Sequence, residues 1–216
     1  MKIRVIIADD HAIIREGLKN LFEKKGMDVI AVARNGREAI DFAMLYHPDV
    51  VMMDISMPDL NGVEATAAIR KQVPGTKIIA LSMHSNKKII DKMLASGASG
   101  YILKEAAFDE LYDAVKEVTK GNFYLPPSIA GMYVDSQGST LKLSGDKLKF
   151  KKISKKERQV LQLVAEGKKN KDIAKTLGVS IKTIESHRKN IMKKLNIFSI
   201  AGLTKFAIKE GIVFLD

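Results

Sequence analysis

Acidic side chains follow two apolar runs in the first half of the chain, where they could bind a divalent cation. Asp9 and Asp10 come directly after residues 3–8, and Asp54 comes directly after residues 50–53. Clustered carboxylates repel one another unless a divalent cation or a lysine lies between them. Oxygen ligands suit Mg²⁺, which accepts one or two carboxylates together with phosphate oxygens, and the chain has no cysteine for thiolate sites or disulfides. These acids therefore predict a Mg²⁺ site suited to phosphate chemistry.

A hydroxyl and an ammonium group follow two further apolar runs. Ser82 comes after residues 77–81, and Lys104 comes after residues 100–103. The carboxyl ends of parallel strands meet at one edge of a sheet, so these two groups are expected to share a pocket with the acids. Taken singly, each acid could cap a helix and Lys104 could be a surface lysine. Taken together, the groups indicate one site.

The elements that must position these side chains alternate along the first 120 residues. Short runs rich in Val and Ile predict five strands, and amphipathic segments between them predict helices. The predicted strands are residues 3–8, 29–33, 50–53, 77–81 and 100–103. Strands without an in/out pattern indicate a parallel sheet covered on both faces. The expected fold is a doubly wound, flavodoxin-like α/β domain over residues 1–121, with His11 as the first residue of a helix and Met52, Met53 and Met57 packed inside.

The positive charge of the chain lies in its second half. Residues 1–120 carry 17 Lys/Arg and 17 Asp/Glu, whereas residues 121–216 carry 19 and 8, which accounts for the whole net charge of +11. A basic half suggests an anionic partner such as nucleic acid, although a solvated lysine-rich surface would have the same composition. Residues 122–152, with Pro126–Pro127, several Gly and Ser and the alternating Lys147, Lys149 and Lys151, predict a linker that holds a short helix at 128–134.

The pattern is helical from Ser154 onward and predicts a small all-α domain over residues 153–216. Ser154 and Glu157 have the spacing of a capping box, and Gly167 ends that first helix. The further helices are expected at residues 170–177, 181–195 and 199–210, with Gly178 in the turn between the first two of these. Two helices joined by a tight turn with glycine predict a helix–turn–helix. The apolar residues expected to pack these helices together are Ala174, Leu177, Val179, Ile184 and Ile191.

The segments VIIADDH, VVMMDISMPDLNG, IIALS and GYILK resemble a response-regulator receiver, over about residues 1–120. The resemblance implies that Asp54 accepts a phosphoryl group from a sensor histidine kinase. It implies that Asp10 and Asp54, with the carbonyl oxygen of Ser56, hold Mg²⁺, while Asp9 acts through water. Lys104 would pair with the phosphoryl group, Ser82 would donate a hydrogen bond to it, and Tyr101 would turn inward. Glu105 stands where many receivers have proline, as is common in one DNA-binding branch of the family. Ser56 and His84 occupy the positions that tune dephosphorylation in the family, and they leave the lifetime of the phosphoryl group open.

The segment ISKKERQVLQLVAEGKKNKDIAKTLGVSIKTIESHRKNIMKKLNI resembles the LuxR-type four-helix DNA-binding domain, over about residues 153–212. Together, the two segments make the chain similar to the NarL/FixJ family of response regulators. This resemblance implies that residues 181–195 form the recognition helix. The residues implied to meet base edges are Glu185, Ser186 and Lys189. Those implied to meet phosphates are Lys182, Thr183, Arg188 and Lys193. His187 is expected to be buried rather than to face DNA.

The expected function is that of a transcription regulator whose dimerisation and sequence-specific binding to double-stranded DNA are promoted by phosphorylation of Asp54. In such proteins the unphosphorylated receiver can mask the recognition helix. The expected receiver surface for dimerisation is the last helix with Tyr101 and residues 87–96, and the first helix is a second candidate. RNA polymerase is a candidate further partner, no membrane is involved, and the expected location is the cytoplasm, because the apolar run at the start is too short for a signal peptide.

Two other functions fit part of the sequence. A regulator that binds DNA without phosphorylation would use the receiver only as a scaffold. A Mg²⁺-dependent phosphohydrolase would use Asp54 covalently, but the acid that protonates a leaving group is missing near Asp54 and the basic half would have no role. We therefore expect no enzyme activity beyond self-dephosphorylation of the aspartyl phosphate.

Overall fold

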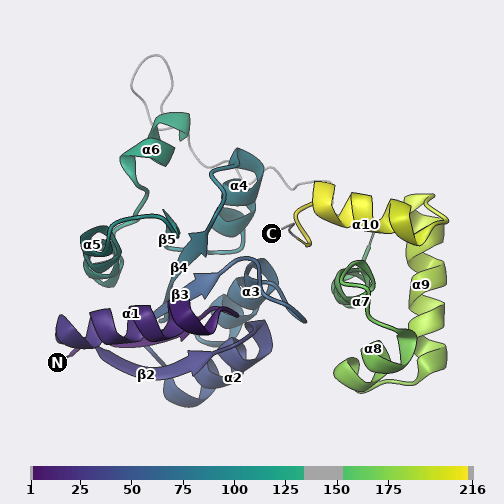
Figure 1. Cartoon of the computed structure of the whole chain (residues 1–216), viewed down its shortest axis with the longest axis horizontal. Helices are drawn as coiled ribbons and strands as arrows, with labels where there is room; N and C mark the ends of the chain where they lie inside the picture. The colour runs from purple at the N-terminus through teal and green to yellow at the C-terminus, as the bar shows by residue number, and fades with distance from the viewer. Residues whose placement is uncertain (1, 134–152, 214–216) are drawn as a thin grey trace. The chain divides into compact units, whose positions relative to one another are not determined.

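A five-stranded parallel sheet covered by helices forms the N-terminal unit of the chain, and the described residues of the C-terminal unit form helices without a strand (Figure 1). The computed structural model describes residues 2–133 and 153–213. The strands are β1 (Arg4–Ala8), β2 (Asp28–Ala33), β3 (Val50–Asp54), β4 (Lys77–Ser82) and β5 (Gly100–Leu103), in the order β2-β1-β3-β4-β5. All five predicted strands are confirmed, each with its ends within one residue of the prediction.

Helices cover both faces of the sheet. Helices α1 (Ala12–Lys24) and α5 (Phe108–Thr119) pack on one face, where they bury Phe22 and Val115 against the strands. Helices α2 (Gly36–Tyr46), α3 (Gly62–Gln72) and α4 (Lys87–Ala95) cover the other face (Figure 1). Right-handed crossovers explain the division, because the chain moves outward from β1 to β2 and then returns past β1 to β3, β4 and β5. With both faces covered, successive residues of β3 are buried and the strand has no polar side, and Met52, Met53 and Met57 are buried as predicted.

The strand order reverses between β1 and β3, and this reversal is where the predicted pocket residues meet. Ala8 pairs with Met53 across the two parallel strands, so the residues that follow, Asp9 and Asp54, leave the sheet side by side. Ligands of open α/β sheets bind at the carboxyl ends of the strands beside such a reversal. The topology therefore accounts for the position of the acidic pocket.

A short helical segment follows the sheet domain. Helix α6 (Pro127–Ala130) and the 3₁₀ turn η1 (Gly131–Tyr133) lie where a helix over residues 128–134 was predicted. The side chain of Tyr133 is buried, and its hydroxyl donates a 2.8 Å hydrogen bond to Asp91 of α4. The rest of the predicted linker, with Lys147, Lys149 and Lys151, lies outside the described residues.

Within residues 153–213 the C-terminal unit has four helices: α7 (Lys155–Ala165), α8 (Asn170–Leu177), α9 (Ile181–Leu195) and α10 (Ile200–Lys209). The Ser154–Glu157 capping box is present. Glycine is required at 178, because the chain turns there with φ +63°, in the left-handed region that side chains rarely adopt. Ile184 and Ile191 of α9 are buried in a core shared with α7 and α10.

One of the predicted packing residues does not pack. Ala174, Ile184 and Ile191 are buried and Leu177 packs against them, but Val179 is 38% exposed. Val179 lies in the turn after α8, where its N–H donates to the carbonyl oxygen of Ala174. That bond fixes the backbone of the turn and leaves the side chain on the outside, so the prediction for Val179 was wrong.

Candidate functional site

Lys104 joins two buried carboxylates at the carboxyl ends of the strands. Its Nζ lies 2.7 Å from Oδ2 of Asp9 and 2.8 Å from Oδ2 of Asp54. All three side chains are nearly inaccessible, at 6%, 0% and 1% exposure respectively. Of the predicted pocket residues, Asp9 follows β1, Asp54 ends β3 and Lys104 follows β5, and the parallel strands bring these three together.

The loop after β3 holds Asp54 from its other side. The backbone N–H of Ser56 donates a 3.1 Å hydrogen bond to Asp54 Oδ1, so both oxygens of this carboxylate have a partner. Gly62 allows the loop to return to the strand, since a Cβ at this position would overlap the carbonyl oxygen of Asp54. The loop therefore fixes the carboxylate in one orientation.

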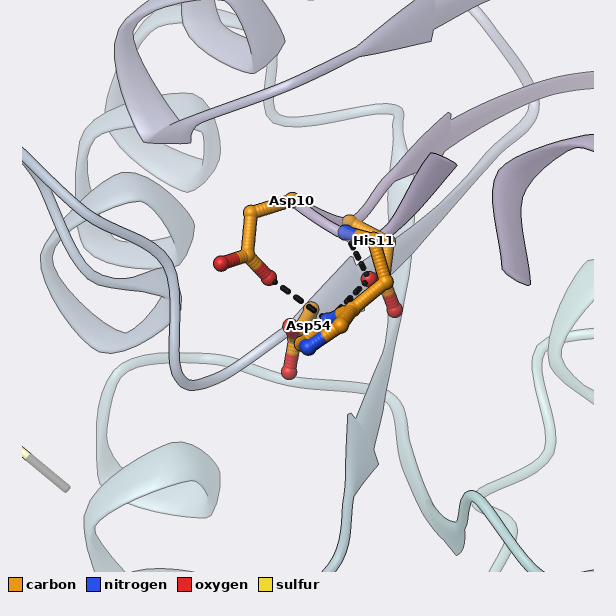
Figure 2. A group of neighbouring side chains, drawn as sticks. Asp10, His11 and Asp54 are labelled. Carbon is orange, nitrogen blue, oxygen red and sulfur yellow. Dashed lines mark hydrogen bonds and ion pairs between the residues drawn. The ribbon is translucent and has the colours of Figure 1, made fainter. Parts of the chain in front are cut away.

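His11 lies beside the acids and not within the first helix. Helix α1 begins at Ala12, and His11 precedes it in an extended conformation, so the prediction that it is the first helical residue was wrong by one position. Its Nδ1 is 3.1 Å from Oδ1 of Asp9 and 2.9 Å from Oδ1 of Asp10, and Figure 2 shows the ring close to Asp10 and Asp54. The sequence signal was available, because a histidine directly follows the acid pair.

The electrostatics of the pocket favour an added cation. Burial and the neighbouring Asp9 carboxylate raise the pKa of Asp54 to about 6, and Lys104 offsets only part of this. Burial lowers the pKa of Lys104, but its ion pairs with Asp54 and Asp9 outweigh burial and raise it. Asp9, Asp10 and Asp54 together carry more negative charge than the single Lys104 ammonium balances, and burial makes that charge costly. Mg²⁺ prefers oxygen ligands and negative charge, so the carboxylates of this pocket suit that ion.

The raised pKa of Asp54, caused mainly by burial, predicts a pH-dependent effect of Asp54→Asn on stability. The folded-state pKa of Asp54 lies above its ordinary value, so the ionised carboxylate destabilises the fold, fully above about pH 6 and hardly at all below about pH 4. In EDTA at pH 8 we expect Asn to raise the free energy of unfolding by up to about 3 kcal/mol, falling to about 1 kcal/mol at pH 4.5. Urea titrations at both pH values measure this, with the exposed Asp28→Asn as control. An equal effect at both pH values would contradict the prediction.

Ser82 and Tyr101 both bond to the backbone of His84, in the loop that follows β4. Ser82 is buried and its Oγ accepts a 3.0 Å hydrogen bond from the N–H of His84. The hydroxyl of Tyr101 donates a 2.6 Å hydrogen bond to the carbonyl oxygen of His84. Tyr101 is fully buried, and burial raises its pKa to about 12. Both side chains thus hold the start of the loop between β4 and α4.

The third helix of the C-terminal unit carries the predicted DNA-contacting residues on its outer side. Lys182, Glu185, Ser186, Lys189 and Lys193 are exposed, and Thr183 and Arg188 are half-buried. His187 is also half-buried, so its predicted burial is only partial. Arg188 donates a hydrogen bond to Asn170 at the start of α8, and Lys194 pairs at 2.8 Å with the buried Glu157 of α7. These contacts fix α9 against its neighbours.

A cavity of about 450 Å³ opens on the same side of α9. Its walls include four of the predicted DNA-contacting residues together with apolar side chains from α9 and the following loop. The lining residues are Asn170, Glu185, Arg188, Lys189, Met192, Lys193 and Phe198. The basic residues of α9 therefore border a concave surface.

Comparisons with known proteins cover both units. A family model described as the response regulator receiver domain matches residues 5–116, and one described as bacterial regulatory proteins of the luxR family matches residues 151–207. The oxygen regulatory protein NreC of Staphylococcus carnosus is 37% identical over 98% of this chain and 99% of that protein. The transcriptional regulatory protein DegU of Brevibacillus brevis is 34% identical over 97% and 94%.

Among solved structures, the complex of the two-component response regulator RcsB with DNA has 30% identity and a TM-score of 0.58, covering 97% of this chain and 99% of that one. RcsB of Salmonella typhimurium has 30% identity and a TM-score of 0.56, covering 95% and 97%. Within residues 2–133 and 153–213, each helix is too short or too polar to cross a membrane.

Proposed function

Since the chain belongs to the two-component response regulators that join a receiver domain to a LuxR-type DNA-binding domain, we propose that Asp54 accepts the phosphoryl group and that this event controls DNA binding by α9. The observation that carries the proposal is the bridge from Lys104 to Asp9 and Asp54. It leaves a fixed, buried carboxylate beside a cation, the arrangement that phosphoryl transfer requires.

In the proposed transfer, an Asp54 carboxylate oxygen attacks the phosphorus atom. The new bond joins that oxygen to phosphorus, and the bond between phosphorus and an imidazole nitrogen of the kinase breaks. The residues proposed to hold Mg²⁺ are Asp9, Asp10, Asp54 and the carbonyl group of Ser56. When bound, the ion neutralises the charge of the attacking carboxylate and the phosphoryl oxygens. The protein's own contribution is to orient Asp54 through the Ser56 N–H and to keep the Lys104 ammonium within reach of the phosphoryl oxygens.

The signal is proposed to leave the pocket through the loop between β4 and α4. A phosphoryl group adds about −1.5 to −2 charge and strong acceptor oxygens, so the Ser82 hydroxyl would turn to donate to it. The backbone of His84 is hydrogen-bonded to Ser82 and to Tyr101. A movement of Ser82 would therefore shift Tyr101 and the start of α4.

Helix α4 in turn contacts the segment that leads out of the receiver. Tyr133 donates to Asp91, and the Lys87 ammonium lies 4.6 Å from the centre of the Tyr133 ring and donates to the carbonyl oxygen of Met132. A shift of α4 would weaken these contacts. The surfaces proposed for dimerisation after phosphorylation remain α4 with α5, or α1.

The test uses beryllium fluoride, which mimics the phosphoryl group, with Mg²⁺. We expect sedimentation velocity to show that the mass doubles, and we expect selection from genomic DNA fragments to show at least about tenfold tighter binding. The same selection with Asp54→Ala distinguishes this proposal from a regulator that uses the receiver only as a scaffold. Such a regulator would bind the same fragments equally well with Asp54→Ala. If beryllium fluoride changed neither the mass nor the affinity for DNA, the proposal would be wrong.

The roles proposed for Glu185 and Lys182 of α9 predict two different effects of single substitutions on DNA binding. Glu185→Gln is expected to change discrimination at one base pair by about 1–3 kcal/mol, because a carboxylate accepts from cytosine N4. Lys182→Ala is expected to weaken binding to all sequences and to reduce the salt slope by about 1. Fluorescence anisotropy at several salt concentrations measures both, with the exposed Lys71→Ala in the receiver as control. If the two substitutions had the same effect, these assignments would be wrong.

A further inference from the structure

Phe198, in the loop after α9, exposes an aromatic ring beside the residues proposed to contact DNA. The residue is 72% exposed, and it is the most exposed aromatic residue within 2–133 and 153–213. A single exposed apolar side chain is normal on a protein surface. This one, however, lines the cavity beside α9 together with Glu185 and Lys189, so any DNA that reaches those two residues comes close to the ring.

The loop that joins α9 to α10 (Figure 1) is fixed on both sides of this ring. Ile197 packs against the core of the helical unit, and its N–H donates a 3.0 Å hydrogen bond to the carbonyl oxygen of Met192. Ser199 caps α10, where its Oγ accepts a 3.1 Å hydrogen bond from the N–H of Gly202. Glycine is needed at 202, because a Cβ there would lie 2.7 Å from the Ile197 side chain. With both neighbours held, the backbone of Phe198 has a fixed position and presents the ring to solvent.

The cavity combines side chains of two kinds. Glu185, Lys189 and Lys193 follow one another at four-residue spacing and share one side of α9, where they suit base edges and phosphates. Met192 and Phe198 add an apolar wall to the same concave surface. A charged phosphate placed against that wall would lose its water without gaining a hydrogen bond. The part of the DNA that covers the wall is therefore expected to be apolar.

We infer that Phe198 is a specificity residue that reads thymine, by packing its ring on the C5-methyl group of a thymine in the major groove. Base edges in that groove offer hydrogen-bond donors and acceptors, and thymine adds a methyl group that apolar side chains such as phenylalanine contact. Glu185 and Lys189 are proposed to meet base edges, and the concave surface that they border extends to Phe198. This inference rests on the proposed function, because it requires α9 to lie in the groove, and it adds a reading residue outside that helix.

The test removes the methyl group from the DNA and the ring from the protein. The probe is a synthetic duplex of the genomic fragment that the full chain binds most tightly with beryllium fluoride and Mg²⁺, in which each thymine is replaced in turn by deoxyuridine. For the unaltered chain, one such replacement in a half-site is expected to weaken binding about threefold to fivefold, the usual effect of one buried methyl group. Phe198→Ala should weaken binding to the thymine duplex about threefold to tenfold and should abolish the effect of that replacement. Fluorescence anisotropy measures all four affinities.

The matched control is Phe123→Ala, which makes the same change at a phenylalanine of the receiver that is 46% exposed and should leave the thymine preference intact. If Phe198→Ala keeps the thymine preference, or if no replacement by deoxyuridine affects the unaltered chain, the inference is overturned. It is also overturned if Phe198→Ala prevents the doubling of mass in sedimentation, because the ring would then pack against a second copy of the chain. If the unaltered chain binds no fragment, the proposed function fails as well, so the two failures can be told apart.

Discussion

Asp54→Asn is expected to abolish phosphoryl uptake from acetyl phosphate in the presence of Mg²⁺. An amide cannot act as the attacking oxygen, and removal of a nucleophile that acts with its neighbours typically costs at least about 1,000-fold in rate. Asn keeps the shape of the side chain, and it should accept the Ser56 N–H much as the carboxylate does. Intact-mass spectrometry after a timed incubation measures the phosphorylated fraction.

The matched control is Asp28→Asn, which makes the same chemical change at an exposed residue at the start of β2. It should take up phosphoryl like the unaltered chain. The sharpest contrary result would be an Asp54→Asn chain that is still phosphorylated at the normal rate. Peptide mapping would then show which of Asp9 and Asp10 carries the group, and the role given to Asp54 would have to be abandoned.

Lys104→Met is expected to cause the second large effect, a loss of about 3–5 kcal/mol in the free energy of unfolding at pH 8 without divalent ions. The ammonium lies within 2.8 Å of two buried carboxylates, and its removal leaves both without their cation. The loss should shrink at pH 5, because the raised pKa of Asp54 lets that carboxyl group take up a proton. Added Mg²⁺ should also restore part of the stability. Urea unfolding followed by circular dichroism measures each case.

A surface ion pair provides the control for this substitution. Lys25 pairs with Asp109 at 3.1 Å, but the two side chains are 44% and 81% exposed, so Lys25→Met should cost no more than about 1 kcal/mol. The double variant Asp54→Asn with Lys104→Met should regain much of the lost stability, since only one buried carboxylate then lacks its partner. Equal losses for Lys104→Met and Lys25→Met would show that the buried bridge contributes little.

The local features of the chain were predictable because their causes are local. The bounds of α8 and α9 follow from Gly178 and Ser180 and agree with prediction at both ends. The capping box at Ser154 depends on residues three positions apart. The strands β1 to β5 follow from short apolar runs. The pocket was also predictable, since residues at the carboxyl ends of parallel strands must meet once the strand order is known.

The directions of side chains, and hydrogen bonds between residues far apart in the chain, were not predictable from the sequence alone. Tyr133 bonds to Asp91 across 42 positions, and Lys194 pairs with Glu157 across 37, although neither spacing leaves a pattern in the sequence. Val179 is apolar, and its side chain is nevertheless exposed because the backbone of the turn directs it toward solvent. His11 was predicted to be the first residue of a helix, but it is still extended, and its ring contacts Asp9 and Asp10.

The sequence by itself therefore determined the two-domain class of the protein, the bounds of its strands to within one residue, those of α8 and α9, and the meeting of Asp9, Asp54 and Lys104 in one pocket. Those properties depend on hydrophobic period, capping and strand ends, which are written in neighbouring residues. Only the tertiary structure decided that Lys104 bridges Asp9 and Asp54, that Tyr133 ties the outgoing segment to α4, and that His11 faces the acids. These contacts depend on rotamers and distances in the packed chain, where one ångström decides whether two groups interact.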